Sequence, residues 1–270
     1  MNDLLSALSA AHFGVFTVRD AYDCGYHRQS LSQLVRSGQA LRVGPSAYVD
    51  RAHYEAASPE RRHEMATRAA VRTFDGRVYA SHYSVLTLMS LPVFGALLDH
   101  IHVARASDSR SRRRPGLSIH SAYGAGAGLQ IGRTPSVNPA LAILGAAMTC
   151  GIETGVVAAD AALATGKTTV DDLQIWLGRL SRHRDVTHAR QAVRLADARS
   201  ESVGESRTRL LLNAIGFRPT SQFEIRDGAR QAGRTGRLPA GTGADHRRVR
   251  WTHEVCRRRR ARGAGLREVA

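Results

Sequence analysis

The stretch Thr17–Val49, TVRDAYDCGYHRQSLSQLVRSGQALRVGPSAYV, decides the fold of the N-terminal region. Thr17 is placed to cap a short helix over 18–24, and Gly25 ends this helix because glycine accepts the left-handed conformation of a helix terminus. A second helix is predicted over 27–37, where leucines and a valine recur at the i, i+3, i+4 spacing of one buried face. The stretch therefore predicts two helices joined by a tight glycine turn.

Two short strands are predicted after the second helix, over 40–43 and 47–49, joined by the turn Gly44-Pro45-Ser46. Before Thr17, Asn2 is placed to cap a first helix whose apolar residues, Leu4, Leu5 and Leu8, are expected to face inward. Helix, turn, helix and a hairpin wing are the layout of a winged helix-turn-helix. In that fold the second helix of the pair enters the major groove of DNA.

The side chains opposite the leucines of the second helix are polar. Amide side chains suit adenine, arginines suit guanine or phosphate, and polar groups on the wing suit backbone phosphates. The predicted DNA contacts are Thr17, Tyr26, His27, Arg28, Gln29, Ser32, Gln33, Arg36, Arg42 and Ser46. Two alternatives stay open, because any surface helix carries solvated polar residues and because winged helices also serve as protein-interaction modules.

The charge of the chain also suits a nucleic-acid partner, but its composition weakens the argument. The 270 residues carry a formal net charge of +16, and Lys167 is the single lysine among 39 basic residues. An arginine bias of this kind is typical of GC-rich coding DNA, so the charge alone does not establish nucleic-acid binding.

Membrane and secretory classes are not expected. The longest apolar runs stay below the ~18 residues of a membrane span, and the first residues lack the layout of a secretory signal. The three cysteines, Cys24, Cys150 and Cys256, are far apart, which argues against a disulfide framework or a zinc knuckle. We expect a soluble cytoplasmic protein.

The middle of the chain is predicted to be helix-rich with a small sheet. Helices are expected over 59–74, 136–151, 153–165, 170–180 and 187–198, and a strand followed by a helix over 79–91. Strands are expected over 100–104 and 117–121. Between them, Ser109–Pro115 is predicted to be a basic loop that either touches phosphate or is merely solvated. His82, His100, His102 and His120 lack metal-ligand spacing, so no metal site is predicted.

Several of these motifs resemble the AbiEi-type antitoxins of type IV toxin–antitoxin systems. The resemblance is carried by the stretch from Thr17 to Tyr48 and by Ser81-His82-Tyr83-Ser84 through Leu91-Pro92. It implies an N-terminal winged helix that binds operator DNA and represses its own operon. It also implies that the antitoxin offsets a nucleotidyltransferase toxin without contacting the toxin's active site.

Three further motifs resemble a narrower group, actinobacterial relatives that add a domain related to very-short-patch-repair endonucleases. These are Asp160-Ala161-Ala162-Leu163, Leu195-Ala196-Asp197 and Glu201-Ser202-Val203-Gly204-Glu205-Ser206-Arg207-Thr208-Arg209. The resemblance implies that Glu205 lies beside a metal site whose carboxylates come from two later strands, V-D-F and V-E-F-D-G, and hold a divalent cation that activates water.

Neither of these two carboxylate-bearing strand motifs, V-D-F and V-E-F-D-G, occurs in this sequence. A strand is predicted over Gln222–Arg226, but after Gly228 the chain becomes rich in arginine, glycine and alanine. Back-translation of Thr235–Val255, read from the second base of each codon, permits R-V-D-F-L-P-E-L-G-L-I-I-V-E-F-D-G-L-M-K-Y, which contains both missing steps in order. We therefore expect a frameshift between about Gly228 and Thr235. The alternative is a natural basic tail that binds nucleic acid or stays disordered.

The sequence thus predicts an α/β (α+β) chain in four parts. These are a winged helix-turn-helix over 1–51, a mixed antitoxin-like region over 52–199, the start of a restriction-endonuclease-like domain over 200–227 and an arginine-rich tail over 228–270. The expected function is a DNA-binding, antitoxin-like transcriptional regulator. The alternatives are a metal-dependent endonuclease, inactive here, and a protein-interaction module. Glu205 is a remnant, no catalytic residue or cofactor is predicted, and Mg²⁺ is expected only for an intact nuclease-like domain.

Overall fold

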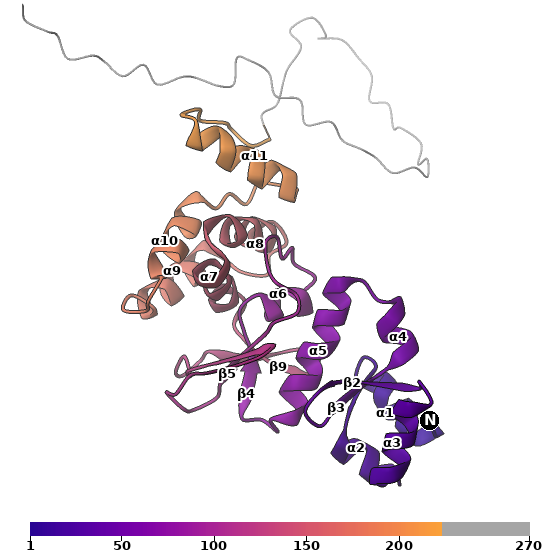
Figure 1. The fold of residues 1–270 in the computed structure, drawn as a ribbon. Coiled ribbons are helices and arrows are strands. Elements are labelled where there is room, and N and C mark those ends of the chain that lie inside the picture. The colour runs from indigo at the N-terminus through magenta and orange to yellow at the C-terminus, as the bar shows by residue number, and fades with distance from the viewer. Residues whose placement is uncertain (223–270) are drawn as a thin grey trace, which may run out of the picture.

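A computed structural model describes residues 1–222 of the chain. The elements form a mixed α/β protein with a small winged unit at one end, a sheet in the centre and a helical layer beyond it (Figure 1). α5 (Pro59–Thr73) lies between the winged unit and the central sheet.

The winged unit has the predicted helix, turn, helix and hairpin. Its elements are α1 (Asp3–Ala11), β1 (Val15–Thr17), α2 (Val18–Asp23), α3 (Arg28–Arg36), β2 (Ala40–Gly44) and β3 (Ala47–Asp50). Side chains of Asn2, Thr17 and His27 cap the three helices. The hairpin is extended to a three-stranded sheet, β1-β3-β2, by β1, a strand that the sequence did not predict.

One predicted core position of the winged unit is wrong. Leu5 is fully buried and Leu8 is half-buried, whereas Leu4 is 68% exposed. The buried face of α1 is centred on Leu5 and Ser9, and Leu4 lies about 100° from Leu5 around the helix axis, outside that face.

α4 (Arg51–Ala56) and α5 connect the winged unit to the rest of the chain. Val15 and Val49 of the small sheet pack with Met65 and Ala69 of α5 in one buried cluster. Beside this contact the guanidinium of Arg72 on α5 donates to both carboxylate oxygens of Asp20 on α2, at 2.7 and 2.6 Å. Apolar packing and an ion pair therefore fix the winged unit on α5.

The central sheet has six strands in the order β6-β7-β5-β4-β9-β8. Its strands are β4 (Val78–Ala80), β5 (Ile101–Arg105), β6 (Arg112–Arg114), β7 (Leu117–His120), β8 (Gly128–Ile131) and β9 (Thr134–Val137). β5 runs parallel to β7, and β4 runs parallel to β9, while the other pairs are antiparallel.

Two predictions for this region need correction. Part of the predicted basic loop is the edge strand β6, whose three exposed arginines pair antiparallel with β7. Charged side chains on an exposed edge discourage pairing with another chain, so the arginine run and a strand are compatible. The predicted helix over 136–151 starts later, because Ser136 and Val137 belong to the β8–β9 hairpin, which the sequence did not predict.

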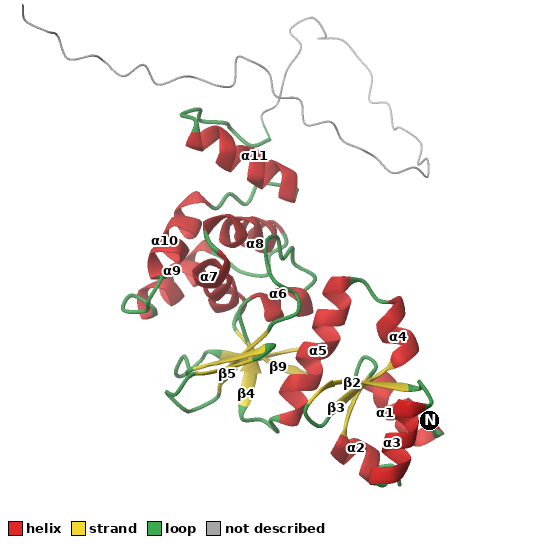
Figure 2. Cartoon of the chain, viewed as in Figure 1, coloured by secondary structure: helices red, strands yellow, loops and turns green. Residues whose placement is uncertain are grey.

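The remaining helices form a layer beyond the central sheet, on the side away from the winged unit (Figure 2). They are α6 (Tyr83–Leu88), α7 (Pro139–Cys150), α8 (Ile152–Ala164), α9 (Val170–Arg179), α10 (Val186–Leu195) and α11 (Val203–Ala214). A Cβ at Gly155 of α8 would lie 2.5 Å from the Cβ of Ala147 and 2.8 Å from that of Ala192. Small side chains thus allow α7, α8 and α10 to pack in close contact.

The predicted strand over Gln222–Arg226 and the arginine-rich tail lie outside the described residues, except for Gln222, which is in a turn. The expected nuclease strands and the frameshift fall in the same part of the chain and stay predictions.

Candidate nucleic-acid interface

α3 presents a polar face to solvent at the end of the molecule opposite α11 (Figure 1). Leu31 and Leu34 are buried against the winged unit. The exposed polar side chains of the helix are Arg28, Gln29, Ser32, Gln33 and Arg36. The leucines thus fix which face of the helix points outward, and five of the ten predicted contacts lie on that face.

The charge of this helix favours an anionic ligand. α3 carries two arginines and no acidic residue over its nine residues. The amide hydrogens of its first turn and the helix dipole add positive potential at its N-terminus, where Arg28 and Gln29 lie. Both features point toward phosphates or the electronegative edge of the major groove.

Local hydrogen bonds restrict three of the predicted contacts. The Nδ1 atom of His27 accepts from the backbone N–H of Ser30 at 3.3 Å, so one ring nitrogen caps α3. The Tyr26 hydroxyl accepts from the backbone N–H of Asn2 at 2.7 Å, and its ring packs on the core of the winged unit. Thr17 is buried, and its hydroxyl belongs to the capping box with Asp20. Thr17 and Tyr26 therefore hold the unit together instead of forming part of a free surface.

The wing supplies the remaining two predicted residues. Arg42 is exposed on β2, and its Nε donates to the carbonyl of Gly44 at 3.1 Å, which leaves the terminal guanidinium nitrogens for other partners. Ser46 is exposed at the tip of the hairpin with a φ of +59°. The wing thus presents one cation and one hydroxyl beside the helix pair.

A groove of about 620 Å³ separates the wing from the edge of the central sheet. Its walls are the wing, α5 and the turn after β6. Four exposed arginines line the groove, namely Arg42, Arg62, Arg77 and Arg114. Asp99 is an acidic residue on the same lining. The arginine-rich edge strand therefore lies across the groove from the wing, a proximity that the sequence could not show.

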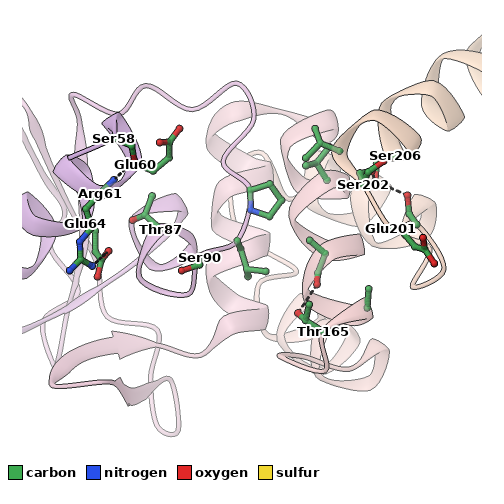
Figure 3. A pocket seen from close by; sticks show the side chains of 17 residues that line it. Ser58, Glu60, Arg61, Glu64, Thr87, Ser90, Thr165, Glu201, Ser202 and Ser206 are labelled. Atoms are coloured by element: carbon green, nitrogen blue, oxygen red, sulfur yellow. Dashed lines mark hydrogen bonds and ion pairs between the residues drawn. The ribbon is translucent and has the colours of Figure 1, made fainter. Parts of the chain in front are cut away.

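A second cavity, of about 660 Å³, lies between α5 and α6 on one side and α8 and α11 on the other (Figure 3). Glu60, Glu64 and Glu201 line it, and Arg61 is paired with Glu64. Its carboxylates oppose the approach of phosphates, and the described residues around it include no histidine or cysteine. The carboxylates therefore make this cavity unsuited to binding DNA.

The motifs that resemble the nuclease-bearing group meet in one buried network. The carboxylate of Asp160 on α8 accepts from the backbone N–H of Asp197 at 2.6 Å, from Ser206 Oγ at 2.7 Å and from Arg209 Nη2 at 2.6 Å. The Asp160 side chain is 1% exposed and that of Arg209 is 7% exposed. These polar residues fasten α11 to α8, so the described contacts give them a structural role.

Glu205, the predicted remnant of a metal site, lies on the first turn of α11 and takes part in its capping. Its Oε2 accepts from the backbone N–H of Glu201 at 3.0 Å and from Gln222 Nε2 at 3.2 Å. Within residues 1–222, Glu205 does not belong to any group of three or more His, Cys, Asp or Glu side chains whose ligand atoms are close enough to share an ion.

Such a group does exist elsewhere in the described residues: His82, His102 and His120 have ligand nitrogens that all lie within 4.8 Å of one another. Burial lowers the pKa of His102 to about 3 and that of His120 to about 4, and it also lowers the pKa of His82 well below its ordinary value. Sequence spacing does not connect these residues, because it matches no metal-ligand motif. His100, the fourth histidine considered, hydrogen-bonds Ser118 instead.

The geometry of the winged unit agrees with a comparison to known families. Residues 3–49 match the family model described as the transcriptional regulator, AbiEi antitoxin. The match covers α1 to β3 and therefore the whole predicted DNA-binding face. No curated protein matches the chain. None of the helices in residues 1–222 is long and apolar enough to cross a membrane.

Proposed function

We propose that the chain represses transcription of its own operon by binding operator DNA through α3. The observation that carries this proposal is the outward polar face of α3, on a unit similar to the AbiEi antitoxin regulators. A helix of this kind inserts its N-terminal residues into the major groove, and its dimensions fit that groove.

The residue types on α3 assign the contacts. Gln29 and Gln33 would each offer an amide to adenine, while Arg28 or Arg36 would pair with guanine or a phosphate. Arg42 and Ser46 would hold the backbone beside the groove that α3 enters. Arg62 and Arg114 line the groove between the wing and the central sheet, and they extend the cationic surface toward β6. This extension would add affinity that falls with salt but carries no sequence preference.

The test is binding of the full chain to a labelled duplex from its own promoter, against a scrambled duplex of equal composition. Arg28→Ala with Gln33→Ala should weaken specific binding by about 1–3 kcal/mol per lost contact, which is roughly tenfold or more for each. Arg190→Ala, an exposed arginine on α10, removes the same charge far from α3 and should leave affinity nearly unchanged. Equal losses in both variants would contradict a specific role for α3.

The cationic groove gives a separate readout. Arg42→Ala and Arg114→Ala should weaken binding to the promoter and to the scrambled duplex alike. Each should also reduce the slope of log affinity against log salt by about 1. An unchanged slope in both variants would remove the groove from the DNA path.

Experiments on the same purified chain distinguish the other candidate functions from operator binding. A winged unit that serves protein interaction would show no DNA affinity at low salt and would co-purify with a neighbouring protein. If the chain counteracts a nucleotidyltransferase toxin without contacting it, the toxin would be neutralised in cells that express the chain but would not co-purify with the chain. Mg²⁺-dependent nicking of DNA by this chain would restore the endonuclease hypothesis.

A further inference from the structure

The topology of the central sheet gathers three histidines that are far apart in sequence. His102 is in β5, His120 ends β7, and His82 follows β4 after Ser81; these three strands are neighbours in the sheet. β5 and β7 run parallel with Ala104 opposite His120, so His102, two residues before Ala104, points to the same face as His120. That face is the one covered by α6 and α7.

The three imidazoles touch one another. His102 Nδ1 and His120 Nε2 lie 2.9 Å apart, and the ring of His82 stacks on that of His120 with centroids 3.8 Å apart. Two ring nitrogens at 2.9 Å must share one proton, because two facing lone pairs repel each other. A cation can replace that proton and satisfy both lone pairs once the two nitrogens move apart to the wider spacing of a metal site.

The surroundings hold His82 in an uncommon conformation. Its backbone has a φ of +52° and a ψ of −144°, a conformation that residues other than glycine rarely adopt. Its ring lies directly against Gly145 of α7, where a Cβ would come within 2.9 Å of the ring atoms. Ser81 Oγ lies 3.1 Å from His82 Nδ1, which is the kind of partner that fixes a ring and leaves Nε2 for a ligand.

We propose that His82, His102 and His120 bind a zinc ion. Imidazole nitrogen is a preferred zinc ligand, and three histidines with a water in the fourth position are a known zinc arrangement. Zinc at about 2.0–2.1 Å from each nitrogen sets tetrahedral ligands about 3.4 Å apart. His102 and His120 are already near this spacing. Binding also requires the His82 ring, which now stacks on His120, to turn so that its Nε2 faces the ion. The bound ion then ties β7, β5 and the start of α6 together.

The inference concerns the middle of the chain and does not depend on DNA binding by α3. Its test is a metal titration of the purified full-length chain after dialysis against EDTA. Zn²⁺ should compete with a chromophoric chelator at one equivalent per chain and raise the thermal midpoint. Co²⁺ should give the visible absorption bands of a tetrahedral site. No absorption bands and no midpoint shift would overturn the proposal.

Variants assign the ligands. His102→Gln with His120→Gln should abolish the bands and lower zinc affinity by more than the roughly 10–100-fold that loss of a ligand's hydrogen-bond partner costs. His100→Gln is the matched control, because its ring lies 5.2 Å from that of His102 but bonds Ser118. Gly145→Ala, which displaces His82, should weaken zinc binding without removing a ligand.

The controls also separate this site from surface histidines and from misfolding. Equal zinc affinity in the double variant and the natural chain would place the ion elsewhere and overturn the proposal. So would a loss in His100→Gln as large as that in the double variant. The far-UV circular dichroism spectrum, recorded in EDTA, shows whether each variant is folded before the metal is added.

Discussion

α3 and α11 are both short helices that mix arginine and serine with leucine, but the protein uses their polar residues in opposite ways. On α3, Arg28 and Arg36 are exposed. On α11, Arg209 and Ser206 are buried and bond Asp160, while Leu211 is 63% exposed. A polar motif therefore indicates a binding surface only when the neighbouring apolar residues bury the other side of its helix.

The same comparison explains why the motif over Glu201–Arg209 is a poor guide to catalysis here. Its most buried polar residues satisfy one carboxylate on a neighbouring helix, and its glutamates stay near the end of α11. A buried charge needs several partners to offset the loss of water. Asp160 accepts hydrogen bonds from three donors, and this structural need explains the serine at 206 and the arginine at 209.

The largest predicted effect follows from that buried pair. Arg209→Ala leaves the carboxylate of Asp160 buried without its cation and should lower the free energy of unfolding by about 3–5 kcal/mol. Urea denaturation measures it. Arg207→Ala is the matched control, since Arg207 pairs with Glu153 on the surface, with side chains 50% and 46% exposed. Its expected cost is about 0–1 kcal/mol. Similar costs for both variants would contradict the difference between α11 and α3.

An intermediate effect is expected at the contact between the winged unit and α5. Arg72→Ala removes two hydrogen bonds to Asp20, whose side chain is 14% exposed, and should cost about 1–3 kcal/mol. The loss would come mainly from the winged unit, so hydrogen exchange should rise in α2 before it rises in α7. Equal rises of hydrogen exchange in α2 and α7 would instead mean that the Arg72–Asp20 pair stabilises the whole fold and not the winged unit in particular.

The same pair predicts a dependence on pH. Burial acts to raise the pKa of Asp20, but hydrogen bonds from Arg72 and Thr17 outweigh it and leave the pKa below its ordinary value. A lowered folded-state pKa gives stability that is present above the unfolded value of about 3.9 and is lost as pH falls through the folded value. The cost of Asp20→Asn, measured by urea denaturation, should therefore shrink between pH 6 and pH 3.

The smallest effect on stability is expected on the exposed face of α3. Arg28→Ala, Gln33→Ala and Arg36→Ala should each change the free energy of unfolding by less than about 0.5 kcal/mol, because their side chains are exposed. Leu31→Ala, on the opposite face, should cost about 2–5 kcal/mol. A large loss of stability in the arginine variants would mean that α3 resembles α11 and would weaken its assignment to DNA.

Local signals were enough to predict most of the helices. Thr17 and Asn2 are caps, Gly25 and Gly38 end helices, and the leucine spacing of α3 has a single buried face. Each of these features acts within a few residues of itself, which is why the winged layout follows from the sequence. The three-residue β1 and β6 and the β8–β9 hairpin were not predicted, because their register depends on partner strands elsewhere in the chain.

The sequence by itself determined the winged unit, the outward face of α3 and the alanine-rich helical layer. Only the tertiary structure decided which polar side chains are exposed to solvent and which are buried in hydrogen bonds within the protein. Spacing along the chain cannot place Asp160 beside Arg209, or bring His82, His102 and His120 to one face of a sheet. These contacts depend on strand order and helix packing, which are set by the burial of the whole core and not by the neighbours of any one residue.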